Sequence, residues 1–580
     1  MKISAHRVYG FLTLLWIGIM LLLTLTPAQE MPITPAWKLV SFDTAAHAGV
    51  FAVLAGLSWL WLRGRRGQSG GRAAALVLLS CVAFGALIEV LQYVMHQGRH
   101  AEWSDLLSDT IGAGLVLLLP LLKRPQPAAL AVGALLLSLP LHAQPTAPDL
   151  ARARRTIEVL ASPAMRGRGY VQQGEHRAAA YLRERLKKLG LQPLAPDYTQ
   201  PFTLDVNTFP GKMSLKLTLS KIASASITPR EITLRPGIDF IAAPASPSVG
   251  PKTYYLNYPD TLIYHNAEAA TSQLLSGRLD AAYSNALLVR AQDEVLLRQP
   301  ANAGLAAQYA ASPHLDIVPK LTASLADAQE KYPHLEVLAT CLPAWATSNQ
   351  ALVTLQVDAQ LLHAYPTQNL AAVVRGSAQP DSFLVVSAHY DHLGMMGSKT
   401  YFPGANDNAS GVALLLELAA HYARPENRPA CSVVFLLFGA EEAGLIGSSY
   451  FVRHPLVPLP RIKFLLNLDL LGTGEEGATV VNGRVYEAAF RQLTALNDAH
   501  RYLPRLTARG PAANSDHFPF SEAGVPAFFM YTRGGSLAYH DVNDRPAALS
   551  LAGFAGAYGL ARDFLDAKGA RPTPIKNPGR

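Results

Sequence analysis

The chain has 580 residues, too many for one hydrophobic core, so several domains are expected. Half of the residues are hydrophobic and only 16% are charged, an apolar balance that indicates a membrane portion. The formal net charge of +8 comes without a basic patch interleaved with aromatic residues, which argues against nucleic-acid binding. The three cysteines include no CxxC pair, which excludes a cysteine-based metal site.

Four apolar runs open the chain, at about 8–26, 45–62, 74–95 and 106–122. Each is long enough, or nearly so, to cross a bilayer as a helix. Basic residues precede the first run, separate the second from the third, and follow the fourth, so they share one side if every run spans. By the positive-inside rule this side is the cytoplasm. The pattern predicts a multi-pass membrane protein that contacts lipid through its N-terminal helices.

A shorter fifth run, AALAVGALLLSLPLHA at 128–143, allows two interpretations. It is either a fifth crossing or an internal signal-like segment that is cleaved after Ala143. Both place the remainder of the chain on the extracytoplasmic side, periplasmic or external.

Three motifs in this region, FDTAAHAGVF, GALIEVLQ and GRHAEWSDLLSDTIGAG, resemble the VanZ-like membrane family over about residues 1–125. Asp109 stands where that family usually has Asn. The resemblance implies an all-α transmembrane bundle at 1–127, followed by the fifth segment at 128–147. It implies little about chemistry.

Beyond this region the pattern changes to that of a folded exported unit. Residues 148–204 contain an amphipathic helix that ends at a glycine. Residues 205–366 show short alternating runs with Pro and Gly, which predict a β-rich insert. Residues 367–570 alternate buried strands with helices, and 571–580 form a tail. This alternation predicts an α/β fold: a mixed sheet with a mostly parallel centre and helices on both faces.

Polar residues follow the predicted strands, at the edge where such folds bind ligands. They are His389, Asp391, Asp407, Glu441, Glu442, Asp469 and His540. A set of imidazoles and carboxylates without a thiolate suits zinc, manganese or cobalt. There are more carboxylates than one zinc ion with an open coordination position can use. Two metal ions about 3.5–4 Å apart account for the full set better.

Six motifs in order, HYDHLG, GANDNASGVA, FGAEEAGLIGS, NLDLLG, SDHFPF and AYHDVND, resemble the dinuclear-zinc aminopeptidase family. That family also contains glutamate carboxypeptidases, glutaminyl cyclases and the transferrin-receptor ectodomain. The resemblance covers about 150–200 and 367–567. It implies the zinc exopeptidase fold, two Zn²⁺ per chain and a metallo-exopeptidase that acts on peptides. The insert occupies the place where some members carry a protease-associated domain.

Position by position, the resemblance implies a role for each residue. Asp407 bridges the two zinc ions. His389 and Asp469 complete one metal, and Glu442 and His540 complete the other. Glu441 is the general base, and Asp391 orients His389. The implied reaction is aminopeptidase hydrolysis of the N-terminal peptide bond by a zinc-bound hydroxide.

Three further residues are candidates near the site. Asp516 and His517 follow Ser515, but neighbours in sequence rarely form a triad and no GxSxG elbow is present, so a serine hydrolase is not expected. We expect Asp516 and His517 to support the metal ligands instead. Tyr531 either lines the substrate pocket, stabilises the oxyanion or packs in the core.

Three alternatives to an aminopeptidase remain. A carboxypeptidase needs a cationic group for the terminal carboxylate, and Arg533 is a candidate. Glutaminyl cyclisation uses one zinc in its known relatives, and a non-catalytic binding module would have lost ligands. The sequence indicates neither the side-chain preference nor the oligomeric state.

Overall fold

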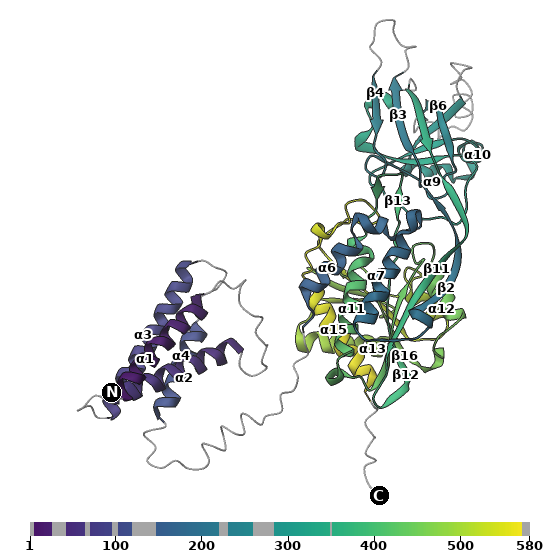
Figure 1. Cartoon of the computed structure of the whole chain (residues 1–580). Helices are drawn as coiled ribbons and strands as arrows, with labels where there is room; N and C mark the ends of the chain where they lie inside the picture. The colour runs from purple at the N-terminus through teal and green to yellow at the C-terminus, as the bar shows by residue number, and fades with distance from the viewer. Residues whose placement is uncertain are drawn as a thin grey trace. The chain divides into compact units, whose positions relative to one another are not determined.

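The computed structural model describes residues 5–25, 42–63, 70–95, 103–118, 147–219, 230–258, 284–347 and 351–570. The chain divides into two compact units, Met1–Thr146 and Ala147–Arg580, which are described here separately (Figure 1).

Within its described residues the N-terminal unit contains four helices, which coincide closely with the four apolar runs. They are α1 (Ala5–Leu25), α2 (Phe42–Arg63), α3 (Gly70–Met95) and α4 (Trp103–Leu118). Gly112 on α4 permits close packing, because a Cβ there would lie 2.0 Å from the carbonyl oxygen of Ala48 on α2. None of the helices in the described residues meets the combined requirement of length and apolarity for a membrane span. The fifth run at 128–143 lies outside the described residues, and the transmembrane character of the bundle stays a prediction.

The C-terminal unit is built on a mixed sheet, nine-stranded within the described residues. Its strand order is β1 (Gln192–Pro193), β11 (Gln360–Val374), β15 (Cys431–Phe438), β12 (Gln379–His389), β16 (Ile462–Leu468), β19 (Ala527–Arg533), β17 (Gly477–Val481) and β18 (Leu506–Ala508), with β2 (Thr199–Thr208) also paired to β11. The central strands β15, β12, β16 and β19 run parallel, and β11 and β17 flank them antiparallel. This confirms the predicted α/β class.

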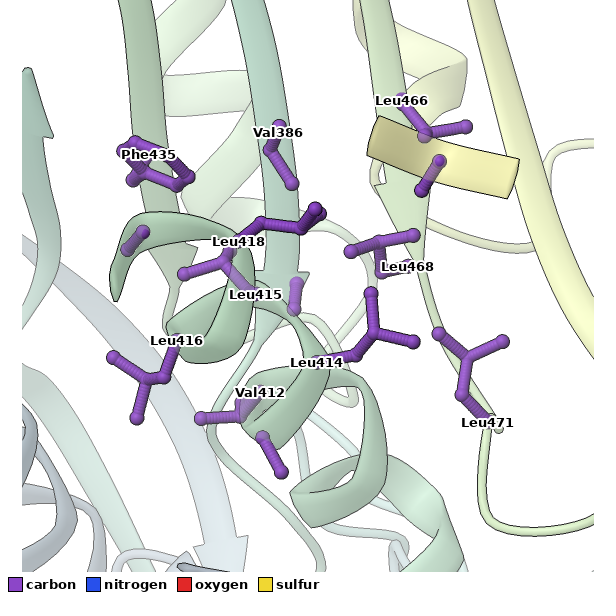
Figure 2. Close-up of a cluster of buried hydrophobic side chains, with 14 of the residues drawn as sticks. Val386, Val412, Leu414, Leu415, Leu416, Leu418, Phe435, Leu466, Leu468 and Leu471 are labelled. Atoms are coloured by element: carbon purple, nitrogen blue, oxygen red, sulfur yellow. The ribbon is translucent and has the colours of Figure 1, made fainter. Parts of the chain in front are cut away.

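The main core of this unit lies where one helix crosses the parallel strands. Helix α11 (Gly411–Tyr422) is apolar around nearly its whole circumference and is buried along its entire length, as expected for a helix with no solvent face. Figure 2 shows Leu414, Leu415 and Leu418 of α11 packed against Val386 of β12 and Leu468 of β16.

Six further α-helices are described in this unit outside the insert. They are α6 (Leu150–Leu160), α7 (Gly174–Lys188), α12 (Ile446–Arg453), α13 (Glu487–His500), α14 (His517–Glu522) and α15 (Phe554–Gly569).

A second sheet forms the insert and is eight-stranded within the described residues. Its order is β4 (Glu231–Leu234), β3 (Met213–Leu219), β10 (Ala351–Val357), β6 (Val249–Asn257), β7 (Ser284–Arg290), β8 (His314–Val318), β9 (His334–Leu338) and β5 (Phe240–Ala242). Two short helices, α9 (Glu294–Leu297) and α10 (Ala303–Ala310), connect β7 to β8. The long strands β2 and β11 pair antiparallel and carry the chain into and out of this sheet (Figure 1).

Candidate metal centre

The candidate ligands cluster because the parallel strands end at one edge of the main sheet. His389 is the last residue of β12 and pairs in register with Phe438, the last residue of β15. Glu441 and Glu442 follow β15, and Asp469 follows β16 directly. His540 lies in the loop after β19, and Asp407 lies in the helical turn Ala405–Ser410 that leads into α11.

Two groups of side chains meet at Asp407. One carboxylate oxygen of Asp407 lies 3.2 Å from His389 Nε2, and the other lies 3.1 Å from His540 Nε2. His389 Nε2 is also 3.4 Å from Asp469 Oδ1, and His540 Nε2 is 3.1 Å from Glu442 Oε2. Asp407 therefore stands between a His389–Asp469 pair and a His540–Glu442 pair, the arrangement that a bridging carboxylate requires.

Glu441 lies beside this cluster at a greater distance. Its Oε2 is 3.9 Å from His389 Nε2, while its backbone N–H donates to Asp391 Oδ1 at 3.1 Å. Glu442 N–H donates to the other oxygen of Asp391 at 3.3 Å. The Asp391 carboxylate thus holds the backbone of both glutamates, and its Oδ1 lies 3.7 Å from His389 Nδ1.

A buried arginine that the sequence reasoning missed supports two of the ligand segments. Arg168, in the segment before α7, has no exposed surface. Its guanidinium donates to the carbonyl oxygens of Leu160, Tyr390, Pro403, Gly404 and Asp407, at 2.7–3.0 Å. It joins the segment after His389 to the one that carries Asp407. Its sequence signal was only an arginine in a glycine-rich run.

Asp544 fixes the other side of the Asp407 turn and was also missed. Its carboxylate accepts hydrogen bonds from the backbone N–H groups of Asn406 and Asp407, at 2.8–3.1 Å. Burial raises its pKa to about 6, although these two N–H groups act in the opposite direction. The sequence feature that could have identified Asp544 is its position in the motif AYHDVND.

Two neighbouring side chains orient ligands directly. His392 Nδ1 lies 2.6 Å from Glu442 Oε1, which leaves Oε2 of Glu442 directed at His540. Ser515 Oγ donates to Asp469 Oδ2 at 2.9 Å and accepts from the Asn467 side chain at 2.8 Å. Of the Ser515–His517 trio, Ser515 hydrogen-bonds to a candidate ligand, and Asp516 and His517 are fully buried.

The insert contacts the candidate site through His540. The ring Nδ1 lies 2.9 Å from the carbonyl oxygen of Ala323, and the Ala323 N–H donates to the His540 carbonyl at 3.0 Å. A carbonyl oxygen can only accept, so Nδ1 carries a proton and Nε2 is the ring nitrogen that faces the cluster.

Three non-glycine residues at the cluster have positive φ. They are Ala440 (φ 56°), Leu470 (φ 55°) and His540 (φ 54°). A left-handed backbone at such residues is uncommon and concentrates at functional sites. Ala440 and Leu470 each lie two residues beyond the end of a strand, next to a candidate ligand, and no residue type signals these backbone turns in the sequence.

The cluster lies at the base of a cavity of about 160 Å³. The cavity is lined by His389, Asp407, Glu441, Asp469, Leu470, Asn514, Phe529, Tyr531, Tyr539 and His540. Tyr531 thus lines the cavity, one of the positions considered for it. Among the described lining residues there is no lysine or arginine, and Arg533 is not one of them.

Burial and neighbouring charge set the protonation of Glu441. Burial raises the pKa of Glu441 well above its usual value, and the negative fields of Asp516, Glu442 and Asp469 add to this, while His389 opposes it. A carboxyl with a raised pKa holds a proton more strongly than an ordinary one, as an acceptor of a proton from water must.

The residues present fit a pair of metal ions. Four buried or nearly buried carboxylates (Asp407, Glu441, Glu442, Asp469) face two imidazoles, so the side chains alone leave an excess of buried negative charge, which is costly. Asp469 Oδ1 is buried without a hydrogen-bond partner among the described residues. Two groups, His389–Asp407–Glu442 and His389–Glu441–Asp469, each place their ligand atoms within 4.8 Å of one another. A nitrogen and oxygen donor set of this kind suits zinc.

These features make up a candidate metal site at one edge of a mixed α/β sheet. Residues 369–564 match Peptidase family M28, and residues 10–124 match VanZ/LLP1. The chain therefore has a Peptidase family M28 domain and an N-terminal VanZ-like domain, which confirms both resemblances.

Curated relatives match parts of the chain. The aminopeptidase YwaD of Bacillus subtilis is 37% identical over 153 residues, covering 25% of this chain and 31% of the relative. The leupeptin-inactivating enzyme 1 of Streptomyces exfoliatus is 34% identical over 154 residues, covering 26% of this chain and 33% of the relative. The matched part of the chain thus spans about a third of the length of each of these two relatives.

Among solved structures, a zinc aminopeptidase from Bacillus subtilis matches with a TM-score of 0.51 and 21% identity. The match covers 73% of this chain and 96% of that one. At this identity the likeness shows the fold.

Proposed function

We propose that the chain is a zinc metallo-aminopeptidase that removes residues from the free amino end of peptides. The observation that carries this proposal is the convergence of His389, Glu442, Asp469 and His540 around the Asp407 carboxylate, with Glu441 beside them but farther from the imidazoles. The relatives named above, an aminopeptidase and a zinc aminopeptidase among them, support the same reaction class.

The residues would divide between two zinc ions. His389 and Asp469 would hold one, His540 and Glu442 the other, and Asp407 would bridge them. Zinc bound there supplies Lewis acidity toward water and toward a carbonyl oxygen.

The chain's own residues perform the proton transfers. Glu441 accepts the proton of the attacking water at its carboxylate and delivers it to the amine that leaves. Asp391 keeps Glu441 in place by binding its backbone N–H, and also anchors Glu442. Tyr531 and Phe529 line the cavity beside the cluster and offer an apolar surface to the side chain of the N-terminal residue.

The side chains that line the cavity bear on the choice between an aminopeptidase and a carboxypeptidase. Its lining includes the carboxylates of Asp407, Glu441 and Asp469, and the described lining residues include no lysine or arginine. A carboxypeptidase needs a cationic side chain to pair with the terminal carboxylate, and none of the described lining residues supplies one. This supports an aminopeptidase over a carboxypeptidase.

A substrate panel tests the proposal. The full chain is assayed with aminoacyl anilides and with matched N-acetylated compounds, before and after chelation, and again after zinc is restored. We expect cleavage of the free-amine compounds alone, lost on chelation and recovered with zinc. Cleavage of N-blocked peptides from the carboxyl end, or activity that survives complete metal removal, contradicts the proposal.

We further propose that the N-terminal unit associates with the membrane and that the peptidase unit is extracytoplasmic. The VanZ/LLP1 match supports this, as do large apolar side chains exposed on α1 and α3, such as Phe11 (66% exposed) and Leu79 (69%). Protease added to intact cells should digest the peptidase unit if it is outside. N-terminal sequencing of the mature chain tests cleavage after Ala143.

A further inference from the structure

A cluster of metal-type side chains lies in the insert, outside the candidate catalytic site. His314 and Asp316 are on β8, two residues apart, so they share one face of the sheet. His334 on β9 pairs in register with His314, because β8 and β9 run parallel. Alternation and register thus bring two imidazoles and a carboxylate to one face.

These three side chains are in contact. His334 Nε2 lies 2.8 Å from Asp316 Oδ2, and the His314 and His334 rings are 4.2 Å apart between centroids. One ligand atom from each of the three residues lies within 4.8 Å of the others. At the candidate catalytic site the imidazole-to-carboxylate contacts are of the same kind, at 3.1–3.4 Å.

The cluster is largely buried, beside apolar residues of β7 and polar residues of α10 and β9, where Glu336 pairs in register with Asp316. His314 is 4% exposed and Asp316 is 2% exposed. On the neighbouring strand β7 the residues in register with them are the buried Leu287 and Val289. Tyr309 of α10 donates to the Asp316 carboxylate, 2.8 and 2.7 Å from its two oxygens. Burying polar groups costs free energy unless they have hydrogen-bond or ion partners.

The tautomer of His314 leaves a ligand atom available. Its Nδ1 lies 3.0 Å from the carbonyl oxygen of Ser312, so Nδ1 carries the proton. Nε2 then presents a lone pair, and no hydrogen bond to it is formed within the described part of the chain. A ring fixed through its other nitrogen is typical of metal-binding histidines.

We propose that His314, Asp316 and His334 form a separate site for one divalent cation of the zinc type. Two imidazoles and one carboxylate are a common ligand set for zinc with an open fourth position. The proposed site lies in the insert. The proposal does not depend on the proposed peptidase activity.

The position of this site gives it a structural consequence. The ligands lie on the two strands that bracket residues 319–333, and this segment contains Ala323, which bonds to His540. A cation held between β8 and β9 closes the base of the segment that contacts the candidate catalytic site.

Metal counting on the full chain tests the proposal. Metal-free protein is loaded with Zn²⁺ or Co²⁺, freed of weakly bound ions and analysed for metal per chain. We expect the double variant His314→Asn/His334→Gln to bind one equivalent fewer than the wild-type chain and to lose one component of the visible Co²⁺ absorption. His363→Asn removes an exposed imidazole paired with Asp205 and should change neither.

Two further variants make the result decisive. Asp316→Asn can still accept the hydrogen bond of Tyr309, so it tests the site even if the double variant fails to fold, and it should also bind one equivalent fewer. Asp407→Asn weakens the candidate catalytic centre but should leave the cation of the insert in place. Equal metal content in the wild-type, His314→Asn/His334→Gln and Asp316→Asn chains overturns the proposal, whatever the peptidase activity.

Discussion

His540 and Ala323 bond to each other twice, ring to carbonyl and amide to carbonyl, across the boundary between the main sheet and the insert. The insert therefore determines which nitrogen of a candidate metal ligand faces the cluster. A proline at 323 removes the amide donor to His540. We expect Ala323→Pro to lower kcat/KM about 10- to 100-fold, the usual effect of losing a residue that orients a metal ligand.

The exposed neighbour Thr322 provides the control for this prediction. Thr322→Pro places the same ring in the same segment without removing the Ala323 amide. A similar loss of activity in both variants would show that the segment matters only through its general conformation.

We expect Arg168 to contribute strongly to the stability of the fold around the site. Arg168→Lys keeps the charge but cannot supply a planar set of donors to five carbonyl groups. The variant leaves buried carbonyl groups without hydrogen-bond donors. We therefore expect the free energy of unfolding to fall by about 3 kcal/mol or more. Chemical denaturation of the wild-type chain and the variant measures this difference in the free energy of unfolding.

Arg177→Lys is the matched control, since the Arg177 side chain is exposed and donates to the backbone of Gln172. It should change stability by less than about 0.5 kcal/mol. Equal effects at Arg168 and Arg177 would refute the role given to the buried guanidinium.

His392 should affect metal affinity through Glu442. His392→Phe removes the donor that lies 2.6 Å from Glu442 Oε1, so Glu442 is no longer held toward His540. We expect zinc affinity to fall about 10- to 100-fold. His392→Gln can restore one N–H donor and should recover part of the loss. Competition with a chelator of known affinity measures both, and unchanged affinity in the Phe variant contradicts this role.

The strands, and the gathering of the polar residues that follow them, could be predicted because both follow simple rules. The buried run before Glu441 is a strand, and polar residues after parallel strands share one edge. The supporting contacts were not predictable in this way. Arg168 binds carbonyl groups, which any residue possesses, and its partners are distant in sequence. The backbone turns at Ala440 and Leu470 depend on tertiary packing, because neither alanine nor leucine favours positive φ.

Glu175 should make stability depend on pH. Burial raises its pKa from the usual 4.5 to about 8. Between these values the folded chain binds more protons than the unfolded chain, so its contribution to stability falls as pH rises from 4.5 to 8. Glu175→Gln removes this titration, and its stability relative to wild type should rise by roughly 3–5 kcal/mol between pH 5 and pH 9. Glu184→Gln, at an exposed position, should run parallel to wild type. Parallel curves for Glu175→Gln as well would show that this carboxyl titrates normally.

The central claim is that Glu441 moves the proton while its neighbours hold the metals. The most direct measurement determines turnover and zinc content on the same preparation of Glu441→Gln. We predict zinc content equal to that of the wild-type chain and turnover of free-amine substrates reduced about 10²- to 10⁴-fold. Turnover near the wild-type rate with zinc retained would contradict the assignment of Glu441 as the base, and with it the mechanism derived from this site.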